Sequence, residues 1–71
     1  MKLNELGLNK NAKLTNIEAP SDIKRRLMDI GFTKGVKIKP ILDGKSMRAY
    51  NIKGTLIAVR KEDTSKIEVE I

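Results

Sequence analysis

Residues 21–35, which read SDIKRRLMDIGFTKG, constrain the fold more than any other stretch, because they show where a helix begins, repeats and ends. Ser21 is a good N-cap, since its hydroxyl can accept a hydrogen bond from a backbone N–H of the first turn. Ile23, Leu27 and Ile30 recur at i, i+4 and i+7, which places them on one face of a helix. The pattern predicts a helix from about Ser21 to Ile30 that buries this face.

Gly31 is the expected end of that helix. The residue after a helix commonly adopts the left-handed conformation, which costs an L-residue roughly 1–2 kcal/mol and glycine almost nothing. Phe32 follows, where an apolar side chain can fold back on the helix, and residues 33–35 form a second turn. The segment therefore predicts a short helix, a sharp stop and an immediate entry into a strand at Val36.

Five short segments outside the helix have the character of strands. Their apolar residues alternate or run together between turn signals such as Asp43-Gly44 and Lys53-Gly54. The segments are 12–18, 36–42, 47–53, 56–60 and 66–71. Short strands at this spacing are typical of a small barrel or rolled sheet. We therefore predict one mainly β domain over residues 1–71, with about five strands and one short helix after the first strand.

Three local irregularities are expected within this pattern. Leu14 and Ile17 are out of step with a period of two, which predicts a bulge near Thr15-Asn16. Pro40 lacks an N–H, so its part of the second strand should be an edge or a bend. Residues 61–65 are polar and could form a single helical turn.

The predicted core is aliphatic, because the chain has only two aromatic residues. The fourth strand is apolar on both faces, which predicts that the helix or a partner covers its outer side. The residues expected inside are Ile23, Leu27, Ile30, Val36, Ile38, Tyr50, Ile52, Ile57, Val59, Ile67 and Val69.

The composition argues against an enzyme and against a tight metal site. The chain has no Cys and no His, so thiolate and imidazole ligands are absent and serine has no histidine base. Glu68 and Glu70 lie two apart on one strand and could bind a divalent cation weakly, although alternating glutamates are usually a solvent face. The chain has no apolar run long enough for a signal peptide or a membrane span, so we expect a soluble intracellular protein.

The charge is unevenly distributed. Residues 24–61 contain eleven Lys or Arg against two Asp, a balance of +9, within a total of +6. A basic centre favours anionic partners, and small barrels often bind nucleic acid. The basic residues that could form a stripe on the sheet are Lys37, Lys39, Lys45, Arg48 and Lys53. Only Phe32 and Tyr50 could stack on bases, and both fit the core better.

The solvent side of the helix is the predicted partner-binding surface. Met28 lies away from the buried face, beside Lys24 and Arg25, and Lys34 follows in the turn. An adaptable apolar side chain among basic residues is a common contact patch. Met28 could instead fold under the N-terminal segment. The competing surface is the outer face of the fourth strand at Leu56.

Three motifs together resemble the FeoA (ferrous iron transport protein A) family. Residues 25–35, RRLMDIGFTKG, resemble its R-x-L-x-[ED]-[LI]-G-[LF]-x-x-G signature. Residues 54–60, GTLIAVR, resemble its G-x-x-[IL]-A-[LV]-R strand, and Glu62 with residues 67–69 is similar to its E-x-x-x-x-I-x-V end. The resemblance covers essentially the whole chain.

The resemblance implies an SH3-like barrel and a cytoplasmic accessory of ferrous iron uptake. The implied partner is FeoB, a membrane transporter with a cytoplasmic G-protein domain, which the accessory would bind and regulate. The family is often labelled as binding transition metals, but no cofactor is expected here. A nucleic-acid-binding module is the alternative function, and a homo-oligomer remains open.

Overall fold

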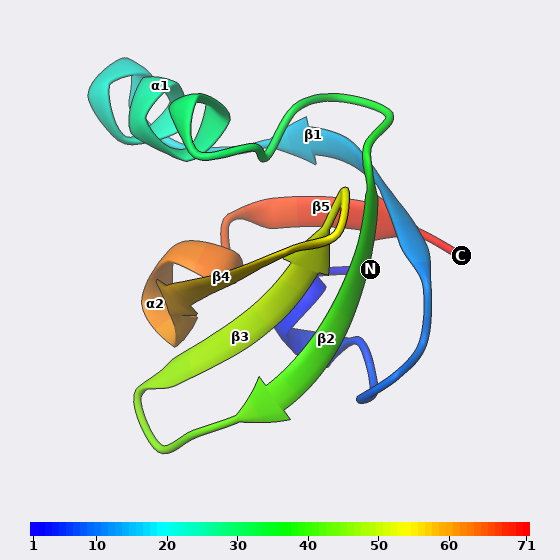
Figure 1. The fold of residues 1–71 in the computed structure, drawn as a ribbon. Coiled ribbons are helices and arrows are strands. Elements are labelled where there is room, and N and C mark those ends of the chain that lie inside the picture. Colours follow the sequence, from blue (N-terminus) through cyan, green and yellow to red (C-terminus); the bar gives the residue numbers. More distant parts are fainter.

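A single five-stranded antiparallel sheet, strongly twisted and rolled, forms the body of the computed structural model, which describes residues 1–71 (Figure 1). The strand order is β4-β3-β2-β1-β5. The elements in chain order are η1 (Leu3–Glu5), β1 (Ala12–Ile17), α1 (Ser21–Asp29), β2 (Lys37–Asp43), β3 (Met47–Ile52), β4 (Thr55–Arg60), α2 (Lys61–Thr64) and β5 (Ile67–Glu70). The predicted mainly β fold with a helix after the first strand is confirmed, as is the helical turn within 61–65.

The end of α1 forms as the sequence predicts. Gly31 has a φ of 122°, and its N–H donates to the Met28 carbonyl at 3.1 Å. The Phe32 N–H donates to the Leu27 carbonyl at 3.0 Å, which completes a Schellman motif. Phe32 then folds back into the core and meets Tyr50 edge to face, with ring centroids 6.2 Å apart.

Two details of the predicted helix are wrong. Ser21 is the first helical residue rather than the N-cap, and no side chain caps the helix; Pro20 occupies the cap position with a φ of −55°. Ile30 is 42% exposed instead of buried, because α1 ends at Asp29 and Ile30 is the C-cap. Only Leu27 is fully buried along the helix, and Ile23 is half-buried.

Both predicted strand irregularities are present. The register between β1 and β5 shifts between Leu14 and Asn16, and that between β2 and β3 shifts between Pro40 and Leu42. The first shift lies next to the expected bulge at Thr15-Asn16, and the second confirms the bend expected at Pro40.

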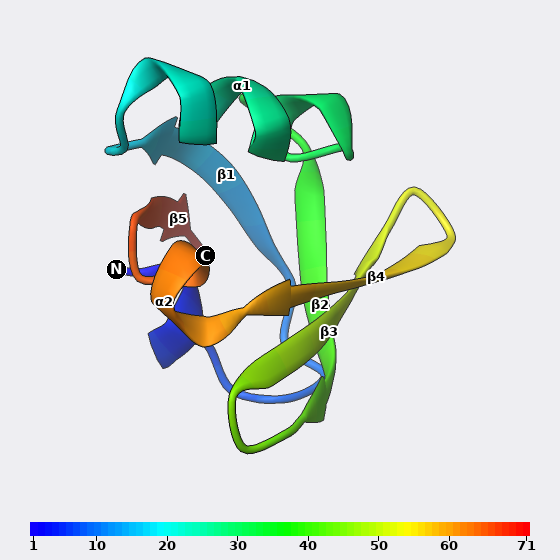
Figure 2. The same cartoon turned by 90° about the vertical axis from the view of Figure 1, so that its left-hand side faces the viewer.

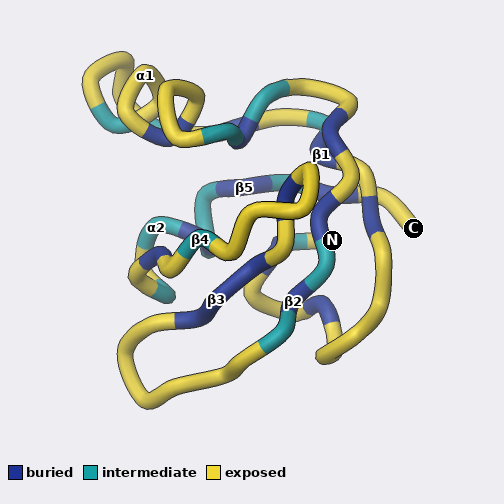
Figure 3. Tube along the Cα trace, viewed as in Figure 1, coloured by how far each residue is buried: buried dark blue, intermediate teal, exposed yellow.

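The core lies inside the rolled sheet, where Figure 3 shows buried residues along the strands and a largely exposed α1. Ile57 is only half-buried, and the N-terminal segment adds two leucines that the sequence did not place there. The buried cluster is Leu3, Leu6, Ala12, Leu14, Ile17, Leu27, Phe32, Val36, Ile38, Tyr50, Ile52, Val59, Ile67 and Val69. The cover expected over the outer face of β4 is absent, since Leu56 is 59% exposed.

Arg48 is the one buried arginine, and it holds the N-terminal segment against β3. Its Nη1 donates to the Leu3 and Asn4 carbonyls at 3.3 Å, and its Nη2 donates to the Leu6 carbonyl at 2.9 Å. Its Nε lies 3.2 Å from a carboxylate oxygen of Asp43. The guanidinium therefore satisfies the Asn4 and Leu6 carbonyls, which have no backbone donor, and is a second donor to the Leu3 carbonyl, which also accepts the Leu6 N–H; these bonds explain how a charge is accommodated at 5% exposure.

Candidate interaction site

A small hollow of about 230 Å³ between α1 and β1, here called the α1–β1 groove, brings together three of the predicted partner-binding residues. Lys24 and Met28 line it from α1, and Lys34 lines it from the turn after the helix. The remaining lining residues are Leu14, Thr15, Asn16, Ile17 and Phe32. Met28 is 44% exposed beside β1, so it does not fold beneath the N-terminal segment.

The local sequence explains this arrangement. Lys24 and Met28 are four residues apart, so they lie one above the other on the same side of the helix. The glycine stop after α1 turns the chain back toward β1, where the Gly35 N–H donates to the Leu14 carbonyl at 2.7 Å. That bond fixes the turn against β1 and so places Lys34 across the groove from the helix.

The groove is cationic with an apolar floor. No carboxylate lies within ion-pair distance of Lys24 or Lys34. Met28 is the exposed apolar side chain between them. The chemistry of the groove therefore suits an acidic surface that can also bury an apolar contact.

Two of the predicted partner-binding residues lie elsewhere. Arg25 is exposed on α1 but does not line the groove. Leu56 is exposed on β4, at the opposite edge of the sheet from β5. The structure therefore separates the two surfaces that the sequence proposed as competitors.

A second hollow of about 420 Å³, here called the α1–β4 groove, was not foreseen. It lies between another face of α1, the strand β4 and the short helix α2. Its lining residues are Ile23, Arg26, Leu27, Ile30, Met47, Ala58, Val59, Arg60, Glu62, Asp63 and Lys66. The signal in the sequence was the apolar face of α1, which we assigned wholly to the core although part of it lines this groove.

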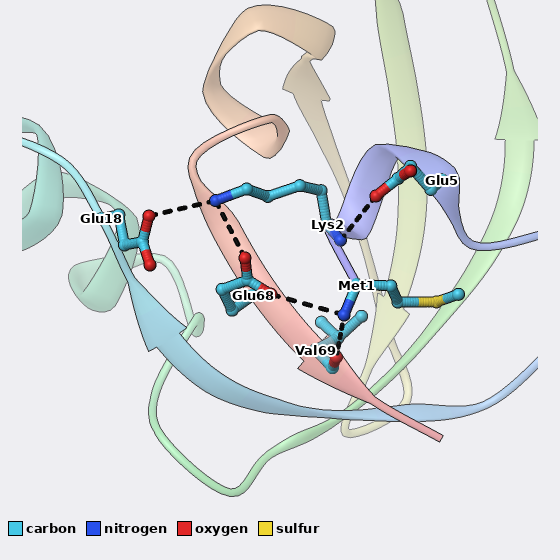
Figure 4. A network of polar contacts seen from close by, with 6 residues as sticks. All are labelled: Met1, Lys2, Glu5, Glu18, Glu68 and Val69. Carbon is cyan, nitrogen blue, oxygen red and sulfur yellow. Dashed lines mark hydrogen bonds and ion pairs between the residues drawn. The ribbon is translucent and has the colours of Figure 1, made fainter.

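The carboxylate of Glu68, one of the two predicted weak metal ligands, is already engaged (Figure 4). The Lys2 ammonium lies 2.9 Å from its Oε1, and the amino group of Met1 lies 3.4 Å from its Oε2. The hydrogen bond from Lys2 holds the pKa of Glu68 below its usual range, and the same bond raises the pKa of Lys2. Lys2 also contacts Glu18 at 3.1 Å. Glu68 is thus part of an ion-pair network.

Neither a metal cluster nor a base-stacking platform is present. No group of three or more His, Cys, Asp or Glu is positioned to hold a metal ion, so the residues do not fit a closed transition-metal site. Arg48, predicted to belong to a basic stripe, is buried, and Phe32 and Tyr50 are 0% exposed. Stacking of single-stranded bases needs exposed rings, so the structure provides no stacking surface for a nucleic-acid-binding module.

The fold and these grooves define a class, a small SH3-like barrel with two grooves beside its helix. The chain belongs to the FeoA family, since the model of the FeoA domain matches residues 1–71. The predicted resemblance is therefore confirmed. This family is implicated in ferrous iron transport. No curated protein matches the chain.

Several solved structures are similar over the whole chain. The FeoA protein of Chlorobium tepidum is 33% identical, with a TM-score of 0.86 over 100% of this chain and 70% of that one. A FeoA-like protein of Clostridium acetobutylicum is 26% identical, with a TM-score of 0.89 over 100% of this chain and 85% of that one.

A zinc-bound structure of the FeoA protein of Stenotrophomonas maltophilia is also similar. It is 26% identical, with a TM-score of 0.86 over 99% of this chain and 89% of that one. That protein is described as a prokaryotic SH3-domain protein and as a candidate activating factor of bacterial ferrous iron transport. The description agrees with the SH3-like barrel expected from the sequence. In the present chain, no helix has both the length and the apolar character needed to cross a membrane.

Proposed function

We propose that this protein is a non-enzymatic cytoplasmic accessory of ferrous iron uptake, which binds and regulates a FeoB-type membrane transporter through its G-protein domain. Membership of the FeoA family supports the transport role. The observation that carries the docking proposal is the α1–β1 groove. Lys24, Met28 and Lys34 line it together, and neither lysine has an ion-pair partner.

The groove suggests how docking would work. Its two lysines attract an acidic surface, speed association and make binding sensitive to salt. Charges of this kind add little affinity at an exposed rim, so Met28 supplies the buried contact. Arg25 adds to the positive field from the neighbouring face of α1.

The test is an NMR titration of the labelled protein with the cytoplasmic domain of a FeoB-type transporter. We expect shifts at Lys24, Met28 and Lys34, and we expect Met28→Asp to weaken binding at least tenfold. Leu8→Asp is the matched control, because Leu8 has the same 44% exposure on a different surface. Leu56→Asp tests whether the partner binds instead to the alternative face on β4.

Three outcomes would contradict the proposal. The first is unchanged affinity of a folded Met28→Asp variant, and the second is loss of binding in Leu56→Asp alone. The third is salt-resistant, saturable binding to single-stranded RNA in the absence of transporter binding, which would favour the nucleic-acid alternative.

We also propose that divalent metal ions bind only weakly. Glu70 remains exposed on β5, whereas its neighbour Glu68 is engaged by two cationic groups. A single free carboxylate provides too few ligands for a stable zinc or iron site.

A further inference from the structure

The α1–β4 groove runs along a free strand edge. In the order β4-β3-β2-β1-β5, β4 pairs only with β3 and is therefore an edge strand. Ala58, Val59 and Arg60 all line the groove, although successive strand residues point to opposite faces of a sheet. A hollow that three successive residues line must lie against the edge of the strand. Figure 2 shows α1 above β4, with α2 at one end of the strand.

The backbone of this edge has hydrogen-bonding groups to offer. Ile52 and Thr55 close the two-residue hairpin between β3 and β4, and the register continues through Tyr50↔Ile57. In an antiparallel ladder every second residue bonds to the neighbouring strand, so Thr55 and Ile57 bond to β3. The N–H and C=O groups of Leu56 and Ala58 therefore point outward, and neither residue takes part in a turn or loop hydrogen bond.

The opposite wall is one face of α1. Ile23, Leu27 and Ile30 present apolar surface to the groove, and Arg26 lies on the same face. A helix set beside a free strand edge is the geometry that accepts an added strand, because the edge supplies backbone hydrogen bonds and the helix supplies side-chain pockets.

We propose that this groove binds an extended peptide segment of another protein, in which apolar and acidic residues alternate, by adding it as a strand to β4. Strand alternation directs every second side chain of the peptide toward α1, where the apolar wall favours an aliphatic residue. The groove carries three cations against two carboxylates of α2, and Arg60 lies 3.7 Å from Glu62, so Arg26 and Lys66 are the cations without an ion-pair partner. With a net charge of +6 on the whole protein, carboxylates on the peptide are the complementary charge.

A second copy of this chain is the less favourable occupant. Antiparallel pairing of β4 with itself would bring two molecules of charge +6 together edge to edge. It would also place Arg60 and Lys61 of both copies, and Lys53 at the hairpin, near the same interface. Positive charge along an edge strand works against self-association, and the same charge attracts an acidic peptide.

This surface is distinct from the proposed transporter-docking groove. Lys24 and Met28 lie on one side of α1, and Ile23, Arg26 and Ile30 line the groove on another side. The two sites can therefore be tested and lost separately.

The test is an amide NMR titration with a capped hexapeptide of alternating glutamate and valine, with a lysine–valine hexapeptide as the charge control. We expect shifts at Leu56, Ala58, Ile23 and Ile30, and at least tenfold weaker binding of the lysine–valine peptide. N-methylation of every second peptide nitrogen, on the edge that faces β4, should weaken binding to a similar extent.

Two variants of the protein complete the experiment. Ala58→Pro removes an outward N–H that does not bond to β3, and Ile30→Asp changes a side chain that is already 42% exposed. Each variant should weaken peptide binding at least tenfold, whereas the control Leu8→Asp should leave it unchanged. If Ala58→Pro does not fold, Ile30→Asp alone tests the proposal. The proposal is overturned by an absence of shifts, by equal binding of both peptides, or by a concentration-dependent dimer that buries β4.

Discussion

Replacement of the buried Arg48 by methionine tests whether the N-terminal segment is held by a charge. Methionine keeps the unbranched apolar stem but removes all three hydrogen bonds to the carbonyls of η1 and its neighbours. It also removes the ion pair with Asp43. The Leu6 carbonyl then has no donor and the Leu3 carbonyl keeps only the Leu6 N–H, in a region where both residues are at most 2% exposed.

The expected loss follows from these contacts. A hydrogen bond to a charged group contributes about 1.5–3 kcal/mol, and part of the sum is offset because the guanidinium no longer has to be desolvated. Asp43 is 46% exposed and keeps its ion pair with Lys61, so the main cost is the buried Leu6 carbonyl left without a donor, about 1–3 kcal/mol, which we expect for Arg48→Met. A 71-residue domain has a total stability of about 4–11 kcal/mol. The variant should therefore lose a substantial part of its stability.

Urea unfolding followed by far-UV circular dichroism measures this loss. Arg48→Lys keeps the charge without the planar fork and should fall between the parent and Arg48→Met. Arg60→Met is the matched control, since the Arg60 side chain is 72% exposed and its replacement should change stability by less than about 0.5 kcal/mol. A loss below about 1 kcal/mol in Arg48→Met would refute the reasoning, because it would show that water replaces the guanidinium.

Three further predictions concern the helix stop, the acid range and metal binding. Gly31→Val should lower the free energy of unfolding, measured in urea, by about 1–3 kcal/mol. The cost comes from the left-handed backbone alone, since a Cβ at this position would make ordinary contacts at 3.5 Å. An unchanged urea midpoint would contradict this prediction. Glu68 has a lowered pKa when folded, so its stabilising effect is complete above its ordinary pKa of 4.5 and is lost as the pH falls through the lowered folded value. Glu68→Gln should therefore flatten the acid limb of stability against pH, and superimposable profiles would exclude a role for the pair with Lys2. Calorimetry with Zn²⁺ should show only weak binding, and submicromolar stoichiometric binding would overturn that expectation.

The elements whose signals are local could be predicted from the sequence. The helix, its glycine stop, the two glycine-containing turns and the bulges each depend on residues within a few positions, and all of them formed. One local signal failed, since Ser21 is the first helical residue and not the N-cap. The errors in burial came where distant segments decide the outcome. Ile30 matched the helical period, but the helix ends one residue earlier and no strand covers it.

Arg48 shows the same limit more sharply. We placed it in an exposed basic stripe, and this placement is wrong, because Arg48 is buried. Nothing near Arg48 in sequence indicates that the carbonyls of residues 3–6 will meet it, about 42–45 positions away. The candidate site has the same limit. The helical spacing predicted that Lys24 and Met28 lie on one side of α1, but the groove itself depends on how the helix lies against β1.

The position of β5 beside β1 has a consequence for how the chain folds. The two hairpins that join β2, β3 and β4 close loops of a few residues, whereas Leu14 pairs with Val69, 55 positions away. Closing a long loop costs more chain entropy than closing a short hairpin, and such distant pairings slow folding. The meander of residues 37–60 can therefore form early, and the joining of β1 to β5 is the late step that completes the barrel. On a ribosome, this step must wait until the last strand has left the exit tunnel.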